Sequence, residues 1–251
     1  MTDKAAGEET FISHLIELRD RLVKSSIGIA LICTVLMLWP GPAAIYDYIA
    51  RPMIAALPVG SKMIATGVIA PFLVPMKVTL VIAFILALPW VFYQLWAFIA
   101  PGLYTHEKKL VLPLVVSSSF LFMSGVAFCY FFVFGRVFKF IGEFAPSSIA
   151  VTPDIENYLD FVMSMCLAFG ATFEVPVVVV ILVRMGVVTV AKLKEIRPYA
   201  IVGAFVIAAI VTPPDVVSQL ALALPMCLLF ELGLMVAPAF VKHTQAPEET
   251  A

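Results

Sequence analysis

Three glutamates stand where a carboxylate could bind a cation. Glu17 lies in an amphipathic N-terminal segment, Glu107 in a polar loop, and Glu174 inside a long apolar run. Carboxylates form strong, often bidentate hydrogen bonds with guanidinium groups. A carboxylate inside a membrane costs on the order of 3 kcal/mol and marks a functional site by default. Glu17 would present an anion at the membrane edge, and Glu174 would form part of a polar groove or of a proton-coupled switch. Each of the three glutamates also has a structural alternative.

In the structural alternatives, each glutamate only stabilises the fold. Glu17 can form an i,i+4 pair with Arg21 on one helix face, and Glu107 can balance the charge of the two lysines that follow it. Glu174 can be a protonated acid that bonds a neighbouring helix.

Bond-making chemistry has little support. The cysteines all lie in apolar runs, which predicts small core residues rather than a disulfide framework or a metal site. The histidines all lie outside those runs, so serines in the membrane have no histidine base, and neither an HExxH motif nor a pair of membrane aspartates occurs. We therefore predict no metal, no cofactor and no enzyme, and an intramembrane protease is disfavoured. The residues are Cys33, Cys129, Cys166, Cys227, His14, His106, His243, Ser117, Ser118, Ser119, Ser124 and Ser164.

The amino-acid composition indicates the class of protein that positions these glutamates. Of 251 residues, 62% are hydrophobic and 13% are charged, with a mean hydropathy of +1.05. Soluble domains have about 25% charged residues, so the chain is predicted to be a polytopic membrane protein. The net charge of −1 provides no basic footprint for nucleic acid. The first apolar run begins only near Leu22, after acidic residues, so no cleavable signal peptide is expected.

Six charge-poor, apolar stretches are predicted to be membrane helices, which gives an all-α bundle and one membrane domain over residues 1–251. A helix needs about 20 apolar residues to cross the hydrocarbon. The fifth stretch is short, about 20 Å as a helix, and should form a tight hairpin with the sixth. The stretches are 25–39, the run between Lys77 and His106, 110–135, 161–183, 198–211 and 216–241.

The loop charges orient the bundle. Eleven Lys and Arg residues fall on the side of the two termini, and four fall on the opposite side. The positive-inside rule therefore places both termini in the cytoplasm. On the opposite side, residues 40–71 predict a short interfacial helix broken by Pro52 and Pro58. The tails, 1–9 and 242–251, are expected to be flexible.

The N-terminal segment predicts a helix on the cytoplasmic membrane surface that leads into the first span. Phe11, Leu15, Leu18 and Leu22 share one helical face, and polar residues share another.

Five motifs resemble those of the TatC family, the multi-pass subunit of the twin-arginine protein translocase. Residues 13–22 read SHLIELRDRL, and residues 93–104 read YQLWAFIAPGLY, followed by HEKK at 106–109. Residues 168–176 read AFGATFEVP, 197–199 read RPY, and 212–215 read TPPD. The resemblance covers roughly residues 10–241 with the motifs in order.

The resemblance implies a receptor for twin-arginine signal peptides in the bacterial cytoplasmic membrane. Such a subunit exports folded proteins with the proton-motive force, assembles with single-span TatA- and TatB-type partners, and self-associates in the complex. Two arginines call for two nearby carboxylates, which the resemblance assigns to Glu17 and Glu107, with Arg19 in the same signature. Phe98 would pack the apolar stem of the peptide. Thr212 and Gln219 would dock a partner helix, although capping of the turn by Thr212 and Asp215 explains them equally well.

Glu174 leaves a second function open. The resemblance favours a polar patch on a concave face for this residue, and a proton-coupled secondary transporter that uses Glu174 is the alternative. Transporters usually carry inverted repeats, and none is visible in the sequence. Pro176 should kink the helix beside Glu174, while Pro52 and Pro89 are expected to shape a turn and a kink.

Overall fold

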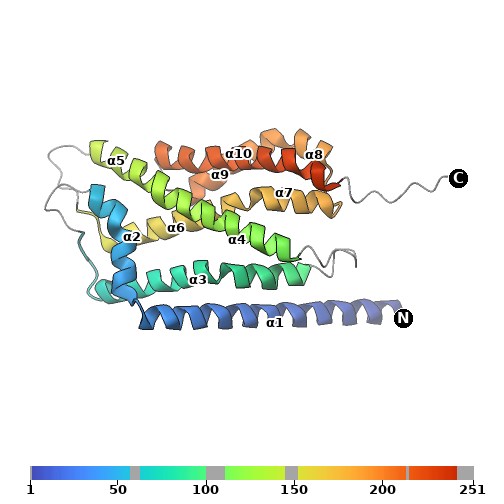
Figure 1. Cartoon of the computed structure of the whole chain (residues 1–251). Coiled ribbons are helices and arrows are strands. Elements are labelled where there is room, and N and C mark those ends of the chain that lie inside the picture. The colour runs from blue at the N-terminus through green and yellow to red at the C-terminus, as the bar shows by residue number, and fades with distance from the viewer. Residues whose placement is uncertain (1, 57–62, 100–110, 145–151, 213–214, 242–251) are drawn as a thin grey trace. The chain divides into compact units, whose positions relative to one another are not determined.

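The computed structural model describes residues 2–56, 63–99, 111–144, 152–212 and 215–241, and these residues are almost entirely helical (Figure 1). One isolated parallel bridge joins Ile64 and Asp154. The helices are α1 Thr2–Leu38, α2 Pro42–Ala56, α3 Ala70–Ile99, α4 Val111–Phe128, the π-helix η3 Cys129–Val133, α5 Phe134–Phe144, α6 Ile155–Phe173, α7 Val175–Arg184, α8 Val190–Glu195, α9 Arg197–Val211 and α10 Val216–Val241.

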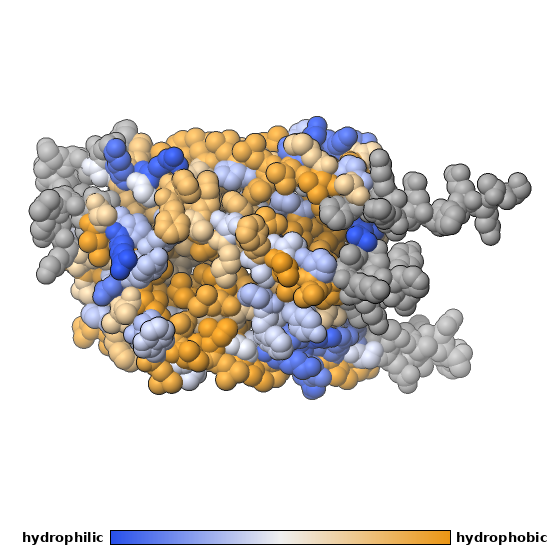
Figure 2. All heavy atoms as spheres, in the orientation of Figure 1, coloured by the Kyte–Doolittle hydropathy of each residue, from blue (hydrophilic) through white to orange (hydrophobic). Residues whose placement is uncertain are grey.

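Five helical stretches are long and apolar enough to cross a membrane. They are Ile12–Leu38, Ala70–Ile99, Val111–Phe140, Ile155–Arg184 and Val216–Ala239. Their apolar side chains cover much of the visible surface (Figure 2). Arg197–Val211 is apolar but shorter, about 22 Å at 1.5 Å per residue. The all-α, polytopic membrane fold is confirmed, while the count of six spans and the cytoplasmic termini remain predictions.

The helices form two compact units. One unit comprises Met1–Tyr46 and Pro75–Ser119, and the other comprises Asp47–Val74 and Phe120–Ala251. The first holds α1 packed along most of α3. The second holds most of the remaining helices, and within it α7 and α10 pack together around Val179, Val183 and Leu234. A single membrane domain stays a prediction.

The N-terminal segment and the first span form one helix. Helix α1 runs from Thr2 to Leu38 without interruption, as expected for a helix that leads into the first span, and its position at the membrane surface stays a prediction. No proline lies within α1, and helices bend sharply only at specific breakers. Its apolar residues continue as exposed side chains, from Leu15 (49% exposed) to Leu31 (64%).

Pro52 does not break its helix, so the expectation of a short helix that is broken at Pro52 is wrong. Helix α2 continues through it to Ala56. A proline leaves the carbonyl four residues earlier without its backbone donor. That carbonyl, on Tyr48, accepts a 2.7 Å hydrogen bond from the Tyr130 hydroxyl, and the Tyr158 hydroxyl donates to the adjacent Ile49 carbonyl at 3.1 Å. The Tyr130 hydroxyl from η3 thus supplies the donor that Pro52 lacks, and the Tyr158 hydroxyl from α6 adds a second contact to the same turn. Pro58 lies outside the described residues.

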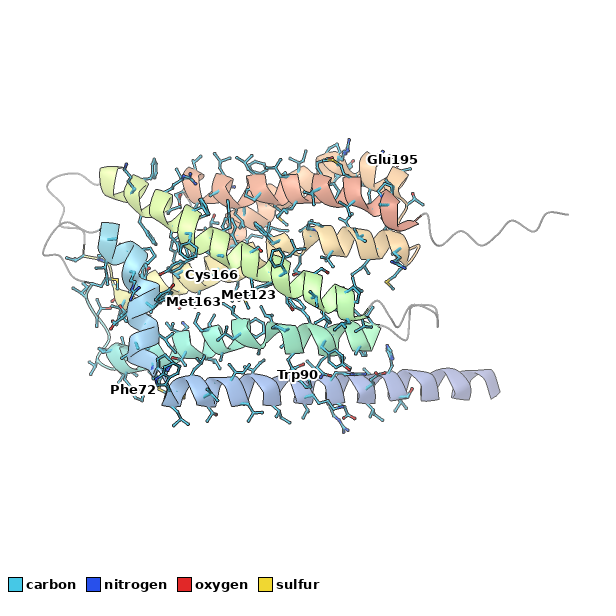
Figure 3. The ribbon with its side chains drawn as sticks, viewed as in Figure 1. Phe72, Trp90, Met123, Met163, Cys166 and Glu195 are labelled. Atoms are coloured by element: carbon cyan, nitrogen blue, oxygen red, sulfur yellow. The ribbon has the colours of Figure 1, made fainter. Side chains whose placement is uncertain are left out.

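Helices α4 and α6 approach each other through glycine. An added Cβ at Gly125 of α4 would lie 2.5 Å from the carbonyl oxygen of Phe169 in α6, and one at Gly170 would clash with the Phe122 ring. Met123 of α4 and Met163 and Cys166 of α6 are labelled in Figure 3. Only a residue without a side chain allows this backbone approach.

Asp154 ties the start of α6 to the segment before α3. Its carboxylate accepts hydrogen bonds from the Thr66 hydroxyl (2.7 Å) and amide (3.0 Å) and from the amides of Glu156 and Asn157. The Thr66 hydroxyl, followed by the Asn157 amide, lowers the pKa of Asp154 below its ordinary value. The charged form is therefore the one that the fold stabilises.

This shift predicts a pH-dependent stability. Because the folded pKa is lowered, the stabilisation is complete above the ordinary carboxyl pKa of about 4 and is lost as the pH falls through the folded value. At neutral pH, Asp154→Asn should lower the melting temperature. At acidic pH, the melting temperatures of the variant and the parent should converge. Thermal unfolding in detergent from neutral to acidic pH measures this. Asp47→Asn, at an exposed position of α2, is the control, and a gap that does not change with pH would contradict the prediction.

Candidate functional site: a guarded carboxylate on α1

A stripe of three residues on α3 faces α1. Trp90, Gln94 and Phe98 are spaced by four, so they share one helix face. The Trp90 indole N–H donates to the Lys24 carbonyl at 3.0 Å, Gln94 accepts from Arg21, and the Phe98 ring stacks on His14 with centroids 4.7 Å apart. In Figure 3, Trp90 lies between the two helices. The stripe fixes α1 lengthwise against α3.

The contact between α1 and the stripe of Trp90, Gln94 and Phe98 on α3 is called the α1–α3 seam, and Glu17 lies along it. Its Oε1 accepts a hydrogen bond from Arg21 Nη2 at 3.2 Å, which forms the predicted i,i+4 ion pair. The Glu17 side chain is 33% exposed and that of Arg21 is 26% exposed. Glu17 is three residues from His14, whose ring contacts Phe98, so two predicted site residues are brought to one seam. The result is a partly exposed carboxylate beside aromatic surface, a combination suited to a cation on an apolar stem.

Arg19 does not belong to this pair. It forms a 2.8 Å ion pair with Asp20 and its side chain is 71% exposed. Positions 17 and 19 are separated by roughly 200° around a helix with 3.6 residues per turn, so Arg19 points away from Glu17. The other predicted carboxylate, Glu107, lies outside the described residues, and its pairing with Glu17 remains a prediction.

Glu174 interrupts the fourth membrane stretch. Helix α6 ends at Phe173 and α7 begins at Val175, so Glu174 alone forms the join. Pro176 is in the first turn of α7, where it needs no backbone donor. The join between α6 and α7 therefore lies beside this proline, and the kink expected there stays a prediction. The Oε1 atom of Glu174 is buried, which places a carboxylic oxygen at a break inside an apolar helix pair.

The predicted docking residues sit at the turn between α9 and α10. The Thr212 hydroxyl donates to the Ala208 carbonyl at 2.8 Å, and the Gln219 amide approaches the Phe205 carbonyl at 3.4 Å. Asp215 accepts from the Ser218 amide at 2.7 Å and so caps α10. Within the described residues, Gln219 links the two helices and Asp215 performs the capping role.

Glu231 is held by an ion pair. Arg197 Nη2, at the start of α9, donates to Glu231 Oε2 on α10 at 2.7 Å. Glu231 also lines a cavity of about 280 Å³ between α9, α10 and Val175. The pair explains how a charged residue is tolerated deep in α10, which supports a structural role.

Sequence reasoning missed three members of the seam, Trp90, Gln94 and His14. Gln94 and His14 stand in motifs that were recognised, but a single sequence does not reveal which face of α3 meets α1. The spacing of Trp90, Gln94 and Phe98 by four residues was the available signal.

These features define a class: a multi-pass helical membrane protein. Among the described residues, no group of three His, Cys, Asp or Glu is placed to hold a metal ion, and the four cysteines are free thiols. Comparison of the whole chain with known proteins identifies the family within this class.

A profile described as Sec-independent protein translocase protein (TatC) matches residues 13–225. The Haemophilus influenzae protein named Sec-independent protein translocase protein TatC is 48% identical over 229 residues, covering 91% of this chain and 89% of that protein. The Escherichia coli K12 protein of the same name is 47% identical over 241 residues, covering 96% and 93%. A crystal structure titled as the twin arginine translocase receptor TatC superposes with a TM-score of 0.78 at 35% identity, covering 90% of this chain and 99% of that chain.

This chain belongs to the TatC family. It is a component of a protein translocase rather than an enzyme, a multi-pass protein of the bacterial cytoplasmic membrane, and one subunit of a Tat complex.

Proposed function

We propose that this chain is the receptor for twin-arginine signal peptides and the core subunit of a translocase that exports folded proteins with the proton-motive force. The observation that carries the proposal is the partly exposed Glu17 carboxylate on the α1–α3 seam, beside the His14–Phe98 ring stack. The solved relative described as a twin arginine translocase receptor supports it.

The proposed recognition uses two carboxylates and an aromatic ring. Glu17 and Glu107 each bind one guanidinium of the signal peptide, because planar guanidinium pairs well with carboxylate. Phe98 contacts the apolar stem that follows the arginines. Arg19, exposed and paired with Asp20, is available to a lipid phosphate or to the peptide backbone at the same end of α1.

The proposed partners are TatA- and TatB-type single-span subunits, further copies of this chain, and the lipid bilayer. Thr212 and Gln219 are proposed to contact a partner helix, since polar groups in membrane helices contribute about 0.6–2 kcal/mol to association. Both side chains act as donors in the hydrogen bonds described above, Thr212 through its hydroxyl and Gln219 through its amide nitrogen. The Thr212 hydroxyl oxygen and the Gln219 amide oxygen can therefore still accept hydrogen bonds from a partner helix.

Glu174 is proposed to serve translocation rather than recognition. It lies at a helix join formed with Pro176, where a titratable side chain can change charge without unwinding a complete helix. Membership of a translocase family favours this role over the transporter alternative.

The test is binding of a fluorescent twin-arginine signal peptide to the purified protein in nanodiscs. We expect the parent chain to prefer this peptide to a twin-lysine version. Glu17→Ala and Glu107→Ala should each weaken binding by tenfold or more, because a hydrogen bond to a charged group contributes about 1.5–3 kcal/mol.

Glu195→Ala is the matched control, because Glu195 pairs with Lys192 at 3.0 Å on α8 and is exposed (Figure 3). It should bind like the parent. Normal binding by both Glu17→Ala and Glu107→Ala would remove the proposed site.

A further inference from the structure

Arg21 bridges two helices through its guanidinium. Nη2 donates to Glu17 Oε1 on α1 at 3.2 Å, and Nη1 donates to Gln94 Oε1 on α3 at 3.3 Å. One side chain of this protein therefore already occupies the carboxylate that the proposed function offers to an arginine of the signal peptide.

Gln94 fixes the bridge. It is 3% exposed, and a buried amide oxygen requires a donor. A guanidinium only donates, so the Gln94 oxygen rather than its nitrogen must face Arg21. Gln94 therefore holds the Arg21 guanidinium against α3 whether or not Glu17 binds another partner.

The bridge leaves Glu17 half engaged. Within the described part of the chain, Oε1 is bound to Arg21 and Oε2 has no hydrogen bond. An incoming cation meets one open carboxylate oxygen beside an existing positive charge. A guanidinium can bind the open oxygen beside Arg21 because it is weakly hydrated and donates from a planar edge. An ammonium binds there less well, because it is strongly hydrated and concentrates its charge.

We propose that Arg21, anchored by Gln94, is a specificity-determining residue that makes the Glu17 site accept arginine and reject lysine. The inference rests on the proposed function. Arg21 acts by penalising the wrong ligand, which is a common source of discrimination. Its contribution is therefore to the ratio of two affinities and not mainly to the affinity for the correct peptide.

The experiment measures dissociation constants of twin-arginine and twin-lysine peptides for the full chain and two variants in nanodiscs. Arg21→Gln removes the resident guanidinium, and we expect the lysine-to-arginine ratio of dissociation constants to fall about tenfold, mainly through tighter lysine binding. Gln94→Leu keeps the guanidinium but removes its anchor, so the ratio should fall in the same direction by a smaller factor.

Lys192→Gln is the matched control, since it removes one positive charge from an exposed ion pair on α8, and its ratio should equal that of the parent. Equal weakening of both peptides by Arg21→Gln, or an unchanged ratio, would overturn the inference and make Arg21 a support for Glu17 alone. If Arg21→Gln fails to fold, Gln94→Leu decides by the same ratio. A parent chain that does not discriminate would instead refute the proposed function, so the two failures are distinct.

Discussion

Gly125→Ala should strongly destabilise the protein. The new methyl group would lie 2.5 Å from the Phe169 carbonyl oxygen and 3.0 Å from the Phe173 ring. The first of these atoms is backbone inside α6, so it cannot move aside as a flexible side chain could. Overpacking a core costs about 1–3 kcal/mol, and we expect a value at or above the upper end because two helices must separate. Thermal unfolding in detergent measures the loss.

Gly135→Ala provides the control on the same continuous helical stretch. An added Cβ at Gly135 meets no atom within 4 Å, and alanine favours helix over glycine by about 1 kcal/mol. This variant should match or exceed the parent in stability. Equal melting temperatures for the two alanine variants would show that the α4–α6 approach is looser than described.

Glu174→Gln should strongly reduce export while leaving the fold intact. Glutamine has nearly the same shape and keeps an oxygen where Glu174 Oε1 is buried, so the join between α6 and α7 should survive. It cannot ionise, however, and the proposed role needs a titratable group. We expect export of a folded reporter protein to fall by at least tenfold, about 1.4 kcal/mol, with a melting temperature close to that of the parent.

The control for this variant is Glu195→Gln, which changes a carboxylate to an amide at an exposed position of α8. Its export should be unchanged. Full export by Glu174→Gln would assign Glu174 to a hydrogen-bonding, structural role, because an amide would then replace it completely.

Membrane physics made much of the fold predictable. The last two stretches were predicted at 198–211 and 216–241, and the structure has Arg197–Val211 and Val216–Val241. A charge-poor run bounded by charged or proline-rich turns leaves the backbone one option in lipid, a helix. The start of α3 was less predictable, because the helix begins at Ala70 and carries Lys77 inside it.

Side-chain pairing was predictable only where one helix contains both partners. The Glu17–Arg21 pair follows from i,i+4 spacing, and the same geometry separates Arg19 from Glu17. The Gln94 contact with Arg21 spans 73 positions, and it depends on which face of α3 meets α1. The continuation of α2 through Pro52 likewise depends on a hydroxyl from Tyr130, which local rules about proline do not include.

The most direct test of the central claim is a double-mutant cycle between Glu17 and each arginine of the signal peptide. Peptide affinity is measured for the parent and Glu17→Gln, each with the parent peptide and with either arginine replaced by glutamine. If Glu17 binds a guanidinium, one arginine should show a coupling energy of about 1.5–3 kcal/mol, while the Glu195→Gln cycle gives none. Coupling below about 0.5 kcal/mol for both arginines, the range of independent sites, would show that Glu17 does not contact the twin-arginine motif.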